Sequence, residues 1–130
     1  MAAYEHLPIF RAMLDATVFV ENMVVHFSRY YKYTLESELR IMCHDALGMI
    51  MEANSAHDRY RHLLRLRVIL EKIKIHLIIA REVKAFHKPK SFYTIVEKIV
   101  AVARQNEGWI KSQSGKARNQ GDNQRKPQKR

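Results

Sequence analysis

The chain has 130 residues, 47% of them hydrophobic, and a formal net charge of +10. This length and apolar content predict one domain with a real core. No apolar run reaches the roughly 18 residues that a bilayer-spanning helix needs, and the first residues do not resemble a signal peptide, so we expect no membrane association. The single cysteine, Cys43, excludes an internal disulfide and is typical of a cytoplasmic protein.

The charge is spread unevenly along the chain. Residues 1–57 hold four Lys/Arg and seven Asp/Glu, a net charge of −3, whereas residues 58–86 carry +5, residues 87–112 carry +3 and residues 113–130 carry +5. An acidic first half and a basic remainder predict a polarised surface, for which a nucleic acid backbone is the commonest reason. The alternatives are a generic anionic surface or a charge excess that serves solubility.

Apolar residues at spacings of three and four predict two helices in the first half. The first helix is expected over residues 8–28, because Pro8 suits a first helical turn. Its apolar stripe is Phe10, Met13, Thr17, Val20, Val24 and Phe27. The second helix is expected over residues 34–53, with Thr34 as its N-cap. Its stripe includes Leu35, Leu39, Met42, Ala46 and Ala53.

The third helix, expected between Asp58 as its N-cap and His87, has two apolar stripes. Pro89 follows, and the residue before a proline avoids helical geometry. One stripe consists of Leu63, Leu66, Leu70, Ile73, Leu77 and Ala80. The other consists of Leu64, Val68, Ile75, Ile79 and Phe86, roughly 140–180° around the helix. A small monomeric bundle needs only one buried face on each helix, so the second stripe predicts a homo-oligomer interface formed by Leu64, Val68, Ile75 and Ile79.

The fourth helix is expected over residues 91–112, with Ser91 as its N-cap. Its apolar positions are Phe92, Ile95, Ile99, Val102 and Trp109, and Asn106 falls on the same stripe. Glycine and proline are few, no strand-like alternation competes, and the connections are short. The sequence therefore predicts an all-α, antiparallel up-down-up-down four-helix bundle over residues 1–112.

Residues 113–130 have a composition unlike the rest of the chain. They consist mainly of Ser, Gly, Asn, Gln, Lys and Arg, with no large apolar residue. Such a segment cannot bury enough surface to offset the entropy of ordering, which predicts a disordered basic tail. The tail either tethers nucleic acid through its charge or is a passive solvated end, and the composition fits both equally.

The chain contains no motif typical of an enzyme, cofactor site or metal site. It has no glycine-rich phosphate loop, no H-E-x-x-H and no paired C-x-x-C. Cys43 and His44 are adjacent on a helix and diverge by about 100°, so they do not form a nucleophile and base pair. We expect a protein without catalytic activity of its own, without a cofactor and without a metal ion.

The basic residues of the third helix are the main functional candidates. They are Arg59, Arg61, Arg65, Arg67, Lys72, Lys74, Arg81 and Lys84. Three acidic residues in residues 58–86 cannot balance these eight, although pairs such as Glu71 with Arg67 or Lys74 account for some of them. Arginine suits phosphate oxygens, so we expect recognition of the backbone rather than of base sequence.

Tyrosines are the second group with a possible role in binding. Tyr30, Tyr31, Tyr33 and Tyr93 have rings that could stack on bases. A tyrosine beside a helix end more often packs its ring and exposes its hydroxyl, and we favour this second interpretation.

The end of the fourth helix resembles a known family. Residues 104–112 read RQNEGWIKS, and residues 51–54, before the third helix, read MEAN. These segments are similar to small bacterial four-helix-bundle proteins that include the accessory variability protein (Avd) of diversity-generating retroelements and the intervening-sequence proteins of ribosomal RNA genes. The resemblance covers roughly residues 10–112, and Asn106 stands where the family usually has an apolar residue.

The resemblance implies a homopentamer without catalytic activity. It also implies binding to a reverse transcriptase and to RNA or DNA during error-prone copying of a template RNA. By resemblance, Trp109 closes the core, Gly108 permits close packing, and Arg104 and Lys111 face the partner or the nucleic acid. The alternatives are a bundle of the intervening-sequence type that binds ribosomal RNA, another RNA-binding adaptor, or a structural oligomer or toxin–antitoxin-like regulator that contacts an acidic protein.

Overall fold

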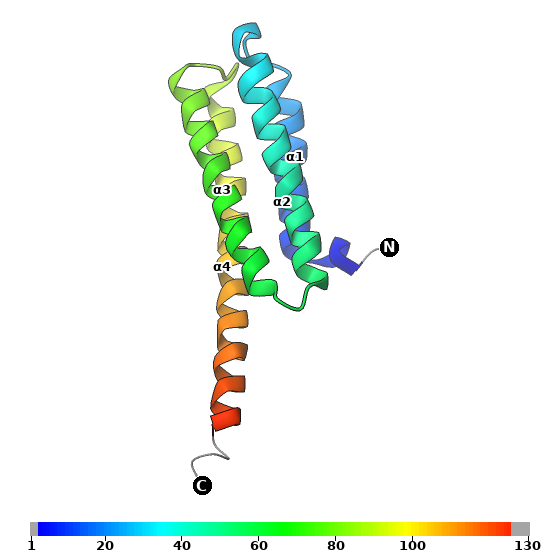
Figure 1. Cartoon of the computed structure of the whole chain (residues 1–130). Coiled ribbons are helices and arrows are strands. Elements are labelled where there is room, and N and C mark those ends of the chain that lie inside the picture. Colours follow the sequence, from blue (N-terminus) through cyan, green and yellow to red (C-terminus); the bar gives the residue numbers. More distant parts are fainter. Residues whose placement is uncertain (1–2, 126–130) are drawn as a thin grey trace.

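The computed structural model describes residues 3–125 and confirms the all-α four-helix bundle (Figure 1). The main helices are α1 (Pro8–Val24), α2 (Ser37–Ser55), α3 (Arg59–Glu82) and α4 (Pro89–Arg125). A 3-10 helix, η1 (Ala3–His6), precedes α1. Two short helices, η2 (Arg29–Tyr31) and the π-helical η3 (Lys32–Glu36), connect α1 to α2.

The chain reverses direction at each connection, so neighbouring helices are antiparallel (Figure 1). Polar contacts between α2 and α3 show the same order, because Glu38 near the start of α2 contacts His76 and Glu52 near its end contacts His62. Each helix contacts the helix before and after it in the chain, and α1 also contacts α4. The four helices therefore form a closed up-down-up-down bundle.

The core consists of the inward stripes that the helical spacing predicts. All six residues of the first α3 stripe are buried, and no other α3 residue is. The core is continuous from Ile9 of α1 to Val102 of α4. A smaller cluster of Ala53, Leu63 and Ile110 closes the end where α2 connects to α3, and Trp109 packs against both clusters. Trp109 is half-buried, in keeping with the predicted core position.

Several predicted helix ends are wrong, for identifiable reasons. The Asp58 N-cap is confirmed, since its carboxylate accepts a hydrogen bond from the Arg61 N–H at 3.5 Å. Thr34 is not an N-cap, because helical structure already begins at η3, and its hydroxyl donates to the Tyr31 carbonyl. Ser91 is also not an N-cap, because α4 already begins at Pro89. Proline suits the first turn of a helix, since the backbone N–H groups of that turn have no intrahelical acceptor and proline lacks an N–H.

The third helix ends at Glu82 rather than near His87. Lys84 has a φ of 59°, the left-handed conformation that terminates a helix. The Ala85 N–H donates to the Ala80 carbonyl at 2.8 Å and the Lys84 N–H to the Arg81 carbonyl at 3.0 Å. These two bonds form a Schellman motif, and they direct Ala85 into the core.

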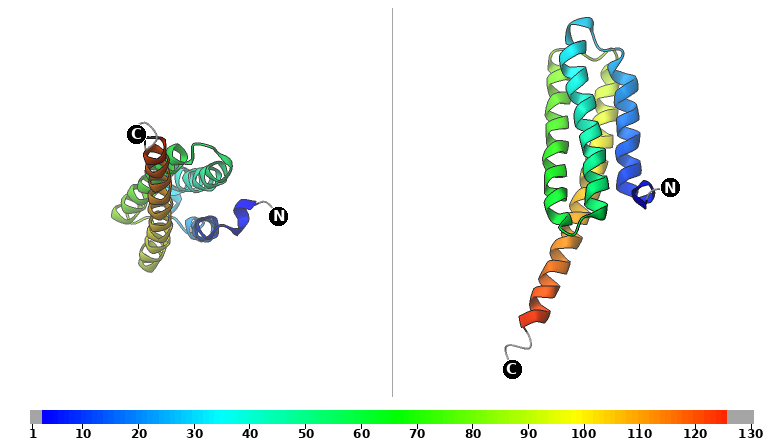
Figure 2. Two further views of the ribbon diagram at one scale, coloured as in Figure 1. Left: turned by 90° about the horizontal axis from the view of Figure 1, so that it is seen from below. Right: turned by 45° about the vertical axis from the view of Figure 1, so that its right-hand side comes forward.

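The fourth helix continues as a helix to Arg125, past the end expected at residue 112. Its last part projects beyond the ends of the other three helices (Figure 2). The division of the chain at residue 112, with a basic tail after it, stays a prediction, and residues 126–130 lie outside the described residues. Within residues 3–125, no helix is both long and apolar enough to cross a membrane.

Candidate nucleic-acid interface

The outward face of α3 is apolar and exposed in the single chain. Val68, Ile75 and Ile79 expose 51%, 53% and 42% of their surface. Leu64 is half-buried against the small cluster at the end of α2. Phe86 does not belong to this face, because α3 ends before it and its ring packs against the core. Three of the five residues of the predicted second stripe therefore lie on an exposed outer surface, and the contact of this stripe with another subunit stays a prediction.

The predicted second stripe does not include one exposed residue of this outer face. Ile78 exposes 44% of its surface and lies next to Ile79. The spacing from Leu64 places it at the margin of the stripe, so strict three-four counting leaves it out. With Ile78 included, isoleucine and valine side chains follow much of the length of α3 on the side away from the core.

The predicted cations flank this apolar face on its two sides. On the side of α2 lie Arg61, Arg65 and Lys72, and all three are exposed. Among the ion pairs shorter than 4 Å that join side chains of residues 3–31 and 33–113, none includes these three. The nearest helix offers carboxylates, but these contact histidines instead. Glu38 lies 2.7 Å from His76 and Glu52 lies 3.9 Å from His62. The charge of this flank is therefore uncompensated and faces solvent.

The cations on the side of α4 already have partners. Arg67 Nη2 lies 2.8 Å from a Glu107 carboxylate oxygen, and this hydrogen bond raises the pKa of the Arg67 guanidinium. Lys74 Nζ lies 2.6 Å from Glu71. The alternative of intrahelical pairing thus describes Lys74, whereas Arg67 pairs across to α4, which helical spacing along one helix does not reveal.

Two further predicted residues have structural contacts of their own. Arg59 donates from Nη2 to the Asn54 carbonyl at 3.2 Å, and this bond ties the α2–α3 connection together. Arg81 lies 3.5 Å from Glu82, and its guanidinium carbon lies 4.7 Å from the centre of the Phe92 ring. Lys84, Arg104 and Lys111 are exposed and take part in no ion pair shorter than 4 Å with the described side chains of residues 3–31 and 33–113.

The predicted role of Gly108 in close packing is wrong. A Cβ atom built at Gly108 has no atom within 4 Å, and the residue is exposed. Gly108 lies two positions after the buried Asn106 and two before the buried Ile110, so the helix turns it away from the core. No neighbouring backbone approaches it, and the packing would tolerate a side chain there.

Asn106 is buried on the apolar stripe of α4, as its position predicts. Its amide nitrogen donates to the Leu63 carbonyl of α3 at 3.0 Å. Its Oδ1 atom is buried without a hydrogen-bond partner. A buried amide that bonds across two helices favours one register between them, at the cost of an acceptor left unpaired.

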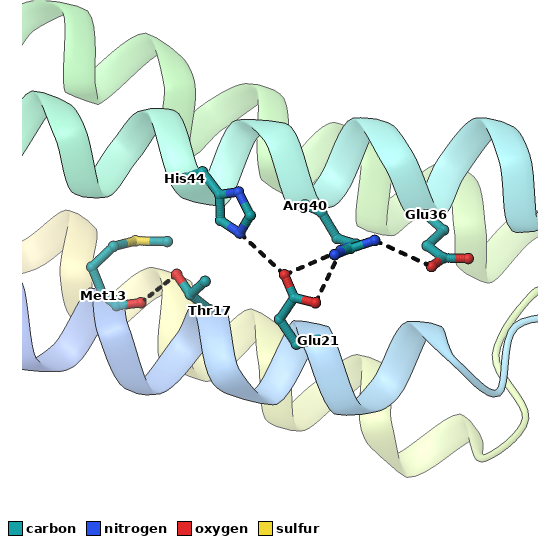
Figure 3. Close-up of polar contacts among 6 residues, drawn as sticks. All are labelled: Met13, Thr17, Glu21, Glu36, Arg40 and His44. Carbon is teal, nitrogen blue, oxygen red and sulfur yellow. Dashed lines mark hydrogen bonds and ion pairs between the residues drawn. The ribbon is translucent and has the colours of Figure 1, made fainter.

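Between α1 and α2, in contrast, one network joins Glu21 of α1 to Arg40 and His44 of α2 (Figure 3). Glu21 accepts from Arg40 Nε at 3.1 Å and lies 3.1 Å from His44 Nε2, and Arg40 also contacts Glu36. Burial opposes ionisation of Glu21, but the hydrogen bonds from Arg40 and His44 outweigh it and lower the pKa of Glu21. This network pairs the cation Arg40 with two carboxylates, so the α1–α2 surface offers no row of unpaired cations like that of Arg61, Arg65 and Lys72.

Cys43 is fully buried beneath this network, as its predicted packing role requires. Burial raises the pKa of its thiol to about 12, so the nucleophilic thiolate is absent near neutral pH. Among residues 3–125, no three His, Cys, Asp or Glu side chains gather in a way that could hold a metal ion.

The chain matches no family model, and a comparison with curated proteins also finds no match.

Proposed function

We propose that this protein is a non-enzymatic, nucleic-acid-binding scaffold, and that it serves as the accessory protein of a reverse transcriptase in a diversity-generating retroelement. The observation that carries the binding proposal is the uncompensated flank of Arg61, Arg65 and Lys72 along α3. An extended row of cations without carboxylate partners attracts a phosphate backbone, because binding releases the counterions condensed on the nucleic acid.

The exposed apolar face beside these cations supports self-association. Val68, Ile75, Ile78 and Ile79 are exposed on one side of α3, and exposing several large apolar side chains there is costly for a monomer. Burying this face against a second copy would also bring the cationic flanks of neighbouring copies into one larger field. A homo-oligomer, and the pentamer that the family resemblance implies, would thus bind RNA more tightly than a single chain through multivalency.

The choice of a reverse transcriptase as partner rests on the resemblance of residues 104–112 to the Avd family. Arg104 and Lys111 of that segment are exposed on α4 and free to contact a partner. A purification of the protein from its host under native conditions, analysed for both protein and RNA, tests this choice. Recovery of a reverse transcriptase supports the retroelement function, whereas recovery of ribosomal RNA alone favours the intervening-sequence alternative.

The binding proposal is tested by paired charge reversals. The double variant Arg65→Glu and Lys72→Glu removes the central cations of the flank, and Arg11→Glu with Arg29→Glu makes the same change in net charge at exposed positions outside α3. Both variants should fold, since all four side chains are exposed. We expect affinity for a single-stranded RNA to fall about 100-fold in the α3 variant and only a few-fold in the control, with a steep salt dependence in the wild type.

Equal losses in the two variants, or a wild-type affinity that does not change with salt, would contradict binding through this flank. Self-association is measured separately by sedimentation. The variant Val68→Glu with Ile75→Glu should dissociate the oligomer, and a wild-type protein that is monomeric at micromolar concentration would refute the assembly.

A further inference from the structure

A small pocket lies beside the connection between α3 and α4. It has a volume of about 330 Å³ and is lined by Arg81, Lys84, Phe86, Pro89, Phe92 and Tyr93. A cavity of this size is at the small end of the range for ligand sites, which run from about 300 to 1,000 Å³. Its lining combines two cations with three aromatic rings, and no acidic residue lines it.

The aromatic rings that line the pocket pack against one another edge to face. The Phe92 ring meets Phe86 at 5.8 Å and Tyr93 at 5.2 Å, both close to perpendicular. Phe86 in turn packs against Phe27 of the chain segment after α1, which anchors the cluster in the core. Phe92 is buried, whereas Tyr93 exposes 62% of its surface. The cluster therefore offers one rigid, accessible ring at the mouth of the pocket.

Arg81 is held in a position suited to stacking. Its guanidinium carbon lies over the Phe92 ring at 4.7 Å, and its Nε lies 3.5 Å from Glu82. A planar guanidinium that covers one ring with one face has its other face available for a second ring. Arginine planes and tyrosine rings are the side chains on which unpaired bases stack.

Lys84 reaches the pocket through a strained backbone. Its φ of 59° is strained for a residue with a Cβ atom, and glycine or asparagine is the usual choice there. The chain keeps a lysine at this position, so a positive charge lines the pocket next to Arg81. Strain of this kind concentrates at functional sites.

We propose that this pocket binds one unpaired nucleotide of an RNA or DNA strand, with the base stacked between Arg81 and Tyr93 and the adjacent phosphate paired with Lys84. The inference rests on the proposed function, because it assigns the pocket to the same nucleic acid. It adds a preference that the cations of α3 do not explain, since a base inside a duplex is already stacked and cannot enter.

The test measures the affinity of the full chain for three probes. They are a single-stranded RNA of about 12 nucleotides, an abasic phosphodiester of the same length and a duplex of the same length. The variants Tyr93→Ala and Arg81→Lys remove the stacking surfaces, and Arg81→Lys keeps the charge. Tyr33→Ala and Lys90→Ala are matched controls, because both residues are exposed near this end of the bundle and neither lines the pocket.

We expect Tyr93→Ala and Arg81→Lys each to weaken binding of the single-stranded RNA about tenfold and to leave binding of the abasic strand and the duplex within about twofold. Lys84→Gly should weaken binding of both the RNA and the abasic strand, and it should raise the melting temperature because glycine relieves the strain at φ 59°. The controls should bind all probes like the wild type.

Two results would overturn the pocket while leaving the proposed function in place. One is loss of RNA binding in the α3 charge-reversal variant but not in Tyr93→Ala or Arg81→Lys. The other is an equal loss of affinity for the RNA and for the abasic strand in Tyr93→Ala and Arg81→Lys, which would mean that the pocket binds only the phosphate backbone and no base. Displacement of the RNA by polyglutamate with the same dependence on Tyr93 would assign the pocket to an acidic peptide and also refute the proposal. A wild-type chain that binds no probe would refute both the pocket and the proposed function.

Discussion

The two helix pairs of this bundle contribute to one core but differ on their outer surfaces. In the α1–α2 pair, Glu21 joins Arg40 and His44 in one ion-pair network, and residues 1–57 carry a net charge of −3. In the α3–α4 pair, Arg61, Arg65 and Lys72 have no carboxylate within 4 Å among the side chains that the structure describes up to residue 113. The first pair joins several of its charges in a network and carries a net negative charge, whereas the second carries an excess of cations.

The second pair also holds most of the departures from ordinary helix chemistry. Lys84 adopts a left-handed backbone, Asn106 buries an acceptor without a partner, and isoleucines face solvent on α3. The first pair has the π-helical η3 in its connection, and Val18 and Ile41 also face solvent there. Proteins concentrate such departures where function requires them. The comparison therefore teaches that the α1–α2 pair completes the fold, while the α3–α4 pair carries the candidate binding surfaces.

The largest expected effect is the loss of stability when a core side chain is truncated, and it tests whether both helix pairs contribute equally to the core. Leu39→Ala in α2 and Ile73→Ala in α3 both truncate fully buried side chains, and each should lower the free energy of unfolding by about 2–5 kcal/mol. Ile75→Ala, on the exposed face of α3, should change it by less than about 0.5 kcal/mol in the monomer. Urea unfolding at low protein concentration measures all three.

A loss at Ile75 as large as that at Ile73 would show that the outer face is buried even in dilute solution. A loss at Ile75 that grows with protein concentration would instead sharpen the comparison, because it would place that face in a subunit interface.

The next effect concerns the buried polar group in the second pair. Asn106→Leu removes the unpaired Oδ1 atom from an apolar stripe, and a neighbouring cavity of about 320 Å³ gives room for the larger side chain. We expect the free energy of unfolding to rise by about 1 kcal/mol, measured by thermal or urea unfolding. A fall in stability would indicate that Oδ1 of Asn106 has a hydrogen-bond partner in solution. Asn106 would then be an ordinary buried polar residue rather than an irregular feature of the second pair.

A gain in stability is also expected at Gly108 in α4. Gly108→Ala places a methyl group in open space on a helix, and the free energy of unfolding should rise by about 0.5–1 kcal/mol because alanine loses less backbone entropy. Circular dichroism during thermal unfolding measures the change. Gly48→Ala in α2 is the matched control, since a Cβ atom there also has no atom within 4 Å. Stabilisation at residue 48 but destabilisation at residue 108 would reveal a contact at Gly108 that a single chain does not contain.

The smallest effect tests the ion pairs of the first pair. The pKa of Glu21 lies below its ordinary value of 4.5 in the folded state, so its pairing stabilises the fold above that pH and is lost as pH falls through the folded-state pKa. Glu21→Gln should lower the free energy of unfolding by about 0.5 kcal/mol at pH 7 and by less below pH 4. Urea unfolding of wild type and variant across this range measures the difference, and a difference that does not shrink in acid would argue against an ionic origin.

The inner faces of the helices could be predicted from the sequence with good detail. Residues such as Leu66 and Ile73 recur at helical spacing because burial against neighbours selects apolar residues once per turn. Asp58 as an N-cap was equally readable, since its side chain acts within its own first turn. The outward position of Val68 and Ile75 followed from the same angular counting.

Contacts between helices could not be predicted from the sequence in the same way. The pairing of Arg67 with Glu107 depends on the register of α3 against α4, and nothing in the local pattern of either helix encodes it. The sequence predicts the end of α3 near His87, because Pro89 is a helix-breaking residue that local pattern reveals. The helix ends earlier, at the Schellman motif of Lys84, and this motif forms only when Ala85 can turn into the core. The family resemblance implies a packing role for Gly108, but the environment of this residue depends on which face of α4 the other helices cover.

The amino-acid sequence by itself determined that this chain forms four helices, which face of each is apolar and how the net charge divides between the two halves, because periodicity and composition act along the chain. Only the tertiary structure decided which cations keep a carboxylate partner, which stay free along α3, and how Arg81, Lys84 and Tyr93 come to line one pocket. Those outcomes depend on distances of a few ångströms between residues far apart in sequence, and packing of the core sets these distances.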